Sequence, residues 1–165
     1  AYMASPEYQK LQDYHPRIQV ETRLTEDLFT IAGSSDHLAK VLANLALNAA
    51  EAMPEGGEVL ITTENRHIDG SGNACVPPDA GDYVVLMVSD SGVPIPSKDL
   101  ERIFEPFYTN KKMGRSGTGL GMTVVWGTVK DHNGDIDVKS ETGKGSIFTL
   151  YFPVKRENPK TVSHR

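Results

Sequence analysis

The stretch SDHLAKVLANLALNAAEAM, residues 35–53, predicts one long helix with an apolar face and a polar face. The apolar positions recur every three or four residues: Leu38, Val41, Leu42, Leu45, Ala49 and Ala52. A second, polar stripe contains His37, Lys40, Asn44, Asn48 and Glu51. Three residues can cap the start of the helix, namely Ser34, Ser35 and Asp36. Its end is expected just before Pro54.

The two asparagines are unusual in the middle of a helix. Solvated helix faces are mostly built from Lys, Glu and Gln, whereas an asparagine competes with its own backbone and costs roughly half a kcal/mol. A solvated surface remains one interpretation of the polar stripe. Because Asn44 and Asn48 lie one turn apart, they also fit a pair of amide ligands that face a shared site.

Length and composition bound the fold and exclude several functions. The 165 residues fit one domain, and 38% hydrophobic with 24% charged residues is ordinary for a soluble protein. No apolar run is long enough for a membrane span, and no signal peptide is expected. The net charge of −5 argues against a general nucleic-acid surface. Cys75 is the single cysteine, which excludes a disulfide framework and favours a reducing, cytoplasmic setting.

The remaining sequence predicts strands, further helices and two irregular ends. Strands are expected at residues 18–22, 58–67, 83–89, 135–140 and 146–152, the last two as a hairpin. Helical segments are expected at residues 25–32, 97–103 and 119–132. Residues 1–16 are interpreted as a linker or the end of an upstream helix, and residues 155–165 as a polar tail. This order favours an α+β two-layer sandwich over a doubly wound fold.

The segment TNKKMGRSGT, residues 109–118, predicts a mobile lid, and the overlapping GRSGTGLG, residues 114–121, leads into a helix as a candidate phosphate site. Its glycines leave backbone N–H groups free at the positive end of the following helix. The spacing is neither the Walker pattern nor a complete dinucleotide fingerprint, because Met122 stands where the final glycine would be. Lys111, Lys112 and Arg115 would balance phosphate charge, or they serve only solubility.

Asp90 stands at the end of a nearly continuous apolar run, two residues before Gly92. Its carboxylate can accept a hydrogen bond from an exocyclic amine, while the glycine lets a flat ring approach the backbone. An Asx turn is the alternative interpretation. The five histidines show no metal-ligand spacing and no catalytic-triad order, so none is assigned a catalytic role.

Four ordered motifs together resemble the catalytic, ATP-binding domain of sensor histidine kinases: NLALNAAEAM, DSG, FEPFYT and GTGLGM. That domain belongs to a superfamily shared with type II topoisomerases, heat-shock chaperones and mismatch-repair ATPases. The resemblance runs from about residue 18 to residue 153, and we expect the domain at residues 17–154. It implies a mixed five-stranded sheet with about three helices on one face, and ATP between the helix layer and the lid.

The resemblance also implies a role for each matching residue. Asn48 would coordinate Mg²⁺, and Asn44 would face the phosphates. Asp90 would accept a hydrogen bond from the adenine amine, and the Ser146 hydroxyl would take part in this contact through a water molecule. The other residues assigned to the nucleotide are Gly92 beneath the base, Ile95, the lid anchors Phe104 and Phe107, and Gly117, Thr118, Gly119, Leu120 and Gly121 of the phosphate loop. The residues expected to reach the terminal phosphate are Lys111, Lys112 and Arg115.

Two departures from the family pattern bear on the reaction. Pro94 replaces a second glycine, which stiffens the turn beside the base, removes an N–H donor and predicts weaker nucleotide binding. The topoisomerase and chaperone branches carry a glutamate base four residues before the magnesium asparagine, and here that position is Asn44. Phosphoryl transfer is therefore favoured over hydrolysis, and Glu51 is interpreted as structural.

The resemblance implies transfer of the ATP γ-phosphoryl group to a histidine on a dimerisation domain. No histidine of this sequence has a phosphoacceptor setting, so that domain is expected upstream of Ala1. A response regulator receiver domain is the second expected partner, with no nucleic acid and no membrane contact. The alternatives are a serine kinase of the anti-sigma type, a degenerate nucleotide-binding or partner-contact module and, least favoured, a water-hydrolysing ATPase.

Overall fold

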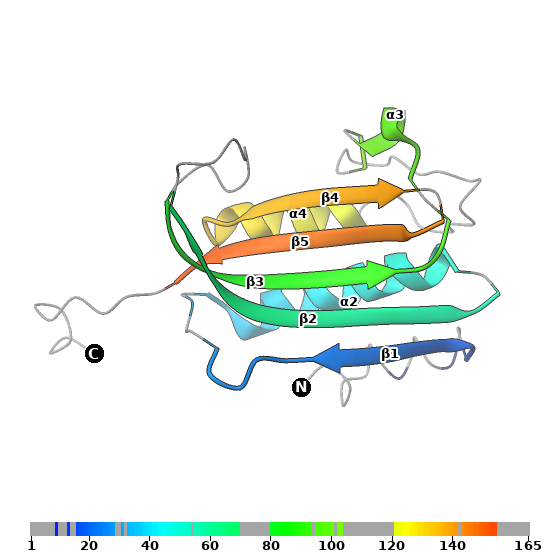
Figure 1. The fold of residues 1–165 in the computed structure, drawn as a ribbon, viewed down its shortest axis with the longest axis horizontal. Helices are drawn as coiled ribbons and strands as arrows, with labels where there is room; N and C mark the ends of the chain where they lie inside the picture. Colours follow the sequence, from blue (N-terminus) through cyan, green and yellow to red (C-terminus); the bar gives the residue numbers. More distant parts are fainter. Residues whose placement is uncertain are drawn as a thin grey trace, which may run out of the picture.

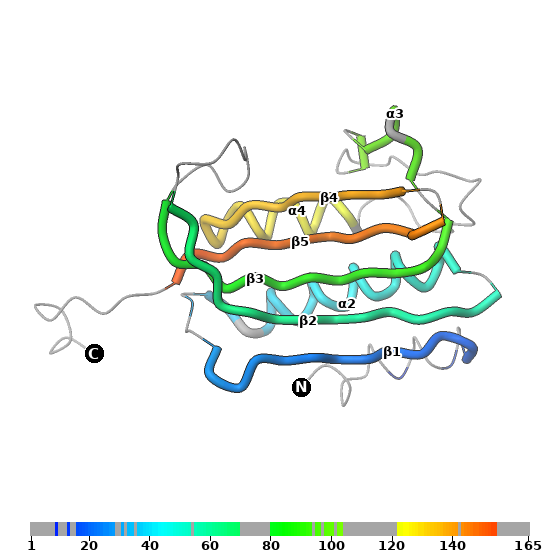
Figure 2. The backbone as a smooth tube through the Cα atoms, viewed as in Figure 1, coloured from blue at the N-terminus to red at the C-terminus, as the bar shows by residue number. Residues whose placement is uncertain are grey.

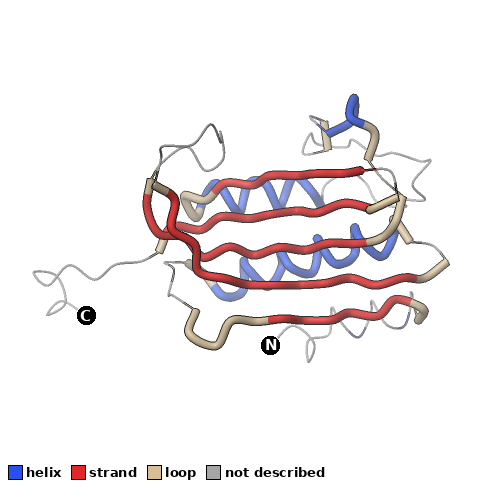
Figure 3. Tube along the Cα trace, viewed as in Figure 1, coloured by secondary structure: helices blue, strands red, loops and turns tan. Residues whose placement is uncertain are grey.

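The computed structural model describes residues 9, 13, 16–28, 31, 33–53, 55–69, 80–93, 95–100, 102–103, 121–141 and 143–154. Its strands are β1 (Ile18–Arg23), β2 (Gly57–Ile68), β3 (Gly81–Asp90), β4 (Asp135–Glu141) and β5 (Gly145–Pro153). Its helices are α2 (Ser35–Glu51), α3 (Ser97–Leu100) and α4 (Gly121–Asp131). The two longer helices, α2 and α4, lie on the same face of the sheet (Figures 1 and 3). This arrangement confirms the predicted two-layer α+β sandwich.

The sheet has the strand order β1-β2-β3-β5-β4 and is mixed, as expected. Only β1 and β2 pair in parallel, with Val20 opposite Val59, because α2 carries the chain back between them. The pairs β2–β3, β3–β5 and β4–β5 are antiparallel. The end of β3 and the start of β5 therefore lie next to each other at one end of the sheet.

Helix α2 forms where the apolar periodicity predicts it and stops two residues earlier, at Glu51. The Ser34 hydroxyl caps it by accepting a hydrogen bond from the backbone N–H of His37 at 3.3 Å. The predicted apolar positions Val41, Leu45 and Ala49 are buried against the sheet. Ala46 and Ala50 are buried as well, although they lie off the predicted stripe, since α2 also packs against α4. None of the described helices is long and apolar enough to cross a membrane.

The two long helices run in opposite directions (Figure 2). A histidine joins the start of α2 to the end of α4. The backbone N–H of Ser34 donates to Nε2 of His132 at 3.1 Å, and Nδ1 of His132 donates to the Thr128 carbonyl oxygen at 2.8 Å. Because one ring nitrogen accepts while the other donates, the contact needs a neutral imidazole with its proton on Nδ1. His132 thus connects the start of α2 to the end of α4.

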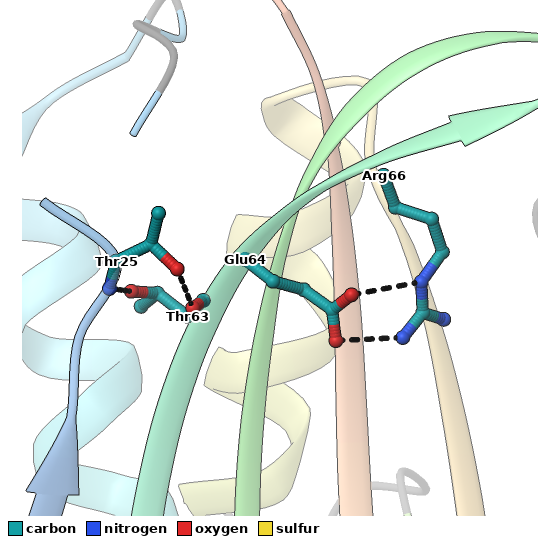
Figure 4. Close-up of polar contacts among 4 residues, drawn as sticks. All are labelled: Thr25, Thr63, Glu64 and Arg66. Carbon is teal, nitrogen blue, oxygen red and sulfur yellow. Dashed lines mark hydrogen bonds and ion pairs between the residues drawn. The ribbon is translucent and has the colours of Figure 1, made fainter. Parts of the chain in front are cut away.

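The main core lies between the helices and the sheet, where Val59, Val88 and Leu150 are almost fully buried. The opposite face of the sheet holds a smaller cluster of Tyr83, Val85 and Tyr151. Its rim is polar: the Arg66 guanidinium pairs with the Glu64 carboxylate at 2.8 Å (Figure 4) and also lies 5.9 Å from the centre of the Tyr151 ring. Alternation along the strands thus gives the sheet two different faces.

The helical turn predicted at residues 25–32 is wrong for the residues of that stretch that the structure describes. Thr25 instead attaches to β2, because its backbone N–H donates to the Thr63 hydroxyl at 3.1 Å and its own hydroxyl donates to the Thr63 carbonyl at 2.6 Å (Figure 4). A turn follows at residues 26–27, and Ile31 forms an isolated bridge with Val154. Long-range pairing with the sheet therefore overrides the local helical preference.

The other predicted helices form but are shorter than expected. The segment at residues 97–103 is helical only over Ser97–Leu100, and Figure 1 shows it beyond the β4 edge of the sheet. Helix α4 begins at Gly121 and ends at Asp131, within the predicted 119–132. Asn133 follows with a positive φ of 59°, as expected for the residue that ends a helix.

Candidate functional site

The residues of the polar stripe on α2 are buried to different depths. Asn48 is only 8% exposed, Asn44 one turn earlier is half-buried, and His37 and Lys40 near the start of the helix are exposed. Asn48 makes no side-chain hydrogen bond within the described part of the chain, although a buried amide without a partner costs about 1–3 kcal/mol. A buried amide that has no partner among the described residues is compatible with a ligand-binding side chain.

Asp90 ends β3 at the same end of the molecule. It is 6% exposed and lies between Val59 of β2 and Ser146 of β5 in the strand register. Its Oδ1 accepts a hydrogen bond from the backbone N–H of Gly92 at 2.9 Å, so the predicted Asx turn is present. This bond fixes the orientation of the buried carboxylate, and the turn and the ligand-binding interpretation are therefore compatible.

The turn after Asp90 is held directly against the end of α2. The backbone N–H of Val93 donates to the Ala52 carbonyl oxygen at 3.0 Å. A Cβ added to Gly92 would lie 2.4 Å from that same oxygen, closer than real Cβ atoms approach. Glycine is required at position 92 because helix and turn meet backbone to backbone. Since Ala52 lies one turn after Asn48, this contact brings Asn48 and Asp90 to one end of the helix layer.

A hydroxyl pair closes the site on the side of β4 and β5. Ser146 is 2% exposed, and its Oγ lies 2.9 Å from Oγ of Ser140, directly across the hairpin. The Ser140 hydroxyl also accepts the backbone N–H of the buried Ile95 at 2.7 Å. The loop that follows Asp90 is therefore fastened to the hairpin as well as to α2.

Gly145 allows β5 to begin beside Asp90. It has a positive φ of 82°, and a Cβ built on it would come within 2.0 Å of the Asp90 carbonyl oxygen. Neither Ser140 nor Gly145 was assigned to the site from the sequence. Only their positions in a predicted hairpin opposite Asp90 and Ser146 could have indicated them, and the register that brings them there is not encoded locally.

Several assigned residues lie outside the described part of the chain. They are Pro94, Phe104, Phe107, Lys111, Lys112, Arg115, Gly117, Thr118, Gly119 and Leu120. Gly121 is described and opens α4, with Met122 buried directly behind it. Among the described residues no cluster of three His, Cys, Asp or Glu side chains could hold a metal ion. Any metal bound by the described residues would thus depend on amide oxygens and on the ligand itself.

Comparison with known proteins agrees with this geometry. Residues 33–156 match the family of histidine kinase-, DNA gyrase B- and HSP90-like ATPases. The sensor kinase CckA of Brucella abortus is 43% identical over 131 residues, which cover 77% of this chain and 13% of that protein. The chain therefore spans only a small part of this relative.

Two solved structures show the same fold with higher coverage. The catalytic domain of the histidine kinase ThkA superposes with a TM-score of 0.66 at 29% identity, covering 91% of this chain and 87% of that one. Full-length ShkA in complex with AMPPNP gives a TM-score of 0.67 at 27% identity, covering 92% of this chain and 30% of that one. The chain is a nucleotide-binding domain and belongs to the histidine kinase-, DNA gyrase B- and HSP90-like ATPase family.

Proposed function

We propose that this chain is the ATP-binding catalytic domain of a sensor histidine kinase and transfers the γ-phosphoryl group of ATP to a histidine on a dimerisation domain outside the given sequence. The single observation that carries the proposal is the buried amide of Asn48, which has no hydrogen-bond partner among the described residues, at the same end of the molecule as the buried carboxylate of Asp90. A purine amine would donate to Asp90, and a phosphate-bound cation would satisfy the Asn48 oxygen. The proposed domain covers residues 17–154, from the start of β1 to the bridge at Val154.

The donor set fits Mg²⁺ that arrives with its nucleotide. Mg²⁺ keeps several waters and binds phosphate oxygens, so one protein amide oxygen suffices. Asn48 would hold the ion, which would draw charge from the phosphates, and Asn44 would face the phosphates from one turn earlier. The remaining charge would be balanced by Lys111, Lys112 and Arg115.

Position 44 favours phosphoryl transfer over hydrolysis. A carboxylate one turn before Asn48 could remove a proton from water, but the half-buried Asn44 cannot act as a base. A histidine nitrogen carries its own lone pair and needs no such base. It would attack the γ-phosphorus, the new N–P bond would form as the bond to the bridging oxygen breaks, and ADP would leave. A response regulator receiver domain would then accept the phosphoryl group, in the cytoplasm.

The key test compares two asparagines in different surroundings. Asn48→Leu removes an amide with no described partner, so we expect unchanged or higher stability to urea and at least about tenfold weaker binding of Mg·ATP. Asn65→Leu is the matched control, because the Asn65 amide donates to the Asp27 carbonyl at 2.9 Å; it should lose stability and keep affinity. Urea denaturation measures the stability of both variants, and isothermal titration calorimetry with and without Mg²⁺ measures their affinity for ATP. Unchanged Mg·ATP binding by Asn48→Leu would refute the assignment.

The transfer step needs a separate measurement. A histidine-bearing dimerisation domain is supplied with radiolabelled ATP and the chain, and the phosphorylated product is treated with acid. Acid-labile label on the supplied domain is the expected result, because a phosphorus–nitrogen bond hydrolyses readily in acid. Acid-stable phosphoserine on a partner, or steady release of phosphate into water, would contradict histidine phosphorylation.

A further inference from the structure

His132 holds the start of α2 against the end of α4 through a contact that only a neutral imidazole can make. The backbone N–H of Ser34 donates to Nε2 of His132 at 3.1 Å, so this nitrogen carries no proton. The ring proton is therefore on Nδ1, which donates to the Thr128 carbonyl oxygen at 2.8 Å. A second proton on the ring would turn the accepting nitrogen into a donor.

Neighbouring groups fix the orientation of the His132 ring. A Cβ added to Gly33 would lie 2.3 Å from Cδ2 and 2.6 Å from Nε2 of the ring, so the ring packs directly on that backbone. The rings of His37 and Phe152 approach it edge-on, with ring centres 6.5 and 6.3 Å away. A proton added to Nε2 would therefore point at the Ser34 N–H, and two donors that face each other at this distance repel.

The surroundings of the ring differ between its α4 side and its α2 side. On the α4 side, Nδ1 bonds a carbonyl in the last turn of the helix, where the helix dipole favours a cation, and the exposed Asp131 is its neighbour in the chain. On the α2 side, Nε2 faces the positive end of a helix. His37 is the titratable side chain that faces the ring from α2, and the exposed Asp36 lies in the same first turn. Strand β5 presents an uncharged aromatic ring.

We propose that His132 is a pH-dependent switch, which joins α2 to α4 when its imidazole is neutral and releases the start of α2 when the imidazole is protonated. An imidazole gains its second proton between about pH 5 and pH 8. The charged ring keeps its bond to the Thr128 carbonyl, because the end of α4 stabilises a cation there. The Ser34 N–H loses its acceptor, and the connection between the two helices opens at this end. The switch lies at the opposite end of α2 from Asn48 and does not depend on the proposed function.

The test follows the backbone amide of Ser34 by hydrogen exchange, measured by NMR spectroscopy at about pH 6 and about pH 8. Each rate is divided into the rate of an unfolded peptide at the same pH, which removes the pH dependence of exchange itself. The resulting protection of Ser34 should fall about threefold to tenfold at the lower pH, the value of one hydrogen bond. The Thr25 N–H is the matched control, because it donates at 3.1 Å to the Thr63 hydroxyl, which does not titrate in this range, and its protection should stay constant.

Two variants and one further measurement identify the group that responds to pH. His132→Gln offers the Ser34 N–H a side-chain oxygen that does not titrate, so the protection of Ser34 should be the same at both pH values. His37→Ala removes the titratable ring that faces His132 and should leave the response unchanged. In the wild type at about pH 8, the nitrogen NMR signals of the His132 ring should show the proton on Nδ1.

The possible results give distinct conclusions. Constant protection of Ser34 while the His132 ring becomes protonated would overturn the proposal. A response that persists in His132→Gln, or that disappears in His37→Ala, would also overturn it, because another group would then respond to pH. A proton on Nε2 of His132 at about pH 8 would refute the proposal even if both variants failed to fold, since that nitrogen could not accept from Ser34.

Discussion

Substituting Gly145 by alanine should cost more stability than the same substitution at Gly143, the other glycine of positive φ in the turn between β4 and β5. A residue other than glycine at its φ of 82° costs about 1–2 kcal/mol. The added Cβ would also come within 2.0 Å of the Asp90 carbonyl oxygen, where ordinary contact begins at 3.4 Å, so β5 and β3 must separate by about 1.4 Å at this point. Such overpacking costs about 1–3 kcal/mol. We therefore expect a total loss of about 2–5 kcal/mol.

Gly143→Ala provides a matched control in the same turn. Gly143 has a nearly identical φ of 84°, but a Cβ added there meets nothing within 4 Å. Gly143→Ala should lower the free energy of unfolding only by the backbone-strain contribution, about 1–2 kcal/mol. The difference between the two variants isolates the contact with Asp90.

Urea denaturation followed by tryptophan fluorescence measures both losses, since the protein has one tryptophan, Trp126 on α4. Calorimetry with ATP provides a second result: Gly145→Ala should bind more weakly because Asp90 is displaced, and Gly143→Ala should bind normally. If the two variants differed by less than about 0.5 kcal/mol, the backbone contact would not have the tight geometry on which this reasoning depends.

Two further substitutions test contacts outside the site. His132→Ala removes the acceptor for the Ser34 N–H and should lower the free energy of unfolding by about 1–3 kcal/mol in urea denaturation. His37→Ala, at an exposed position, should change the free energy of unfolding little. Equal losses in the two variants would contradict the role of His132 in joining the helices. Thr63→Val removes the acceptor for the Thr25 N–H and should lower the free energy of unfolding by about 0.5–1.5 kcal/mol in urea denaturation, with unchanged ATP affinity. An unchanged unfolding midpoint would show that this contact does not stabilise the edge of the sheet.

Local patterns in the sequence were enough to predict the helix layer and most strands. The three-and-four spacing of Val41, Leu45 and Ala49 places α2 correctly, because a periodic apolar stripe is a property of the helix itself. The alternating and apolar runs likewise predict all five strands within a few residues of their ends. The helix predicted at residues 25–32 failed because Thr25 finds its partner on β2, far away in the sequence.

The sequence by itself determined the family, the polar stripe of α2 and the placement of Asp90 at the end of a buried strand. These signals depend on residue type and on spacing within one element, which a single segment can carry. The tertiary structure decided that Asn48 is buried without a described partner, that Gly145 touches the backbone of Asp90, and that Ser140 bonds both Ile95 and Ser146. Each of these depends on the register between strands or on the packing of a helix end against a turn. Such contacts join residues that are distant in the chain, so no local pattern specifies them.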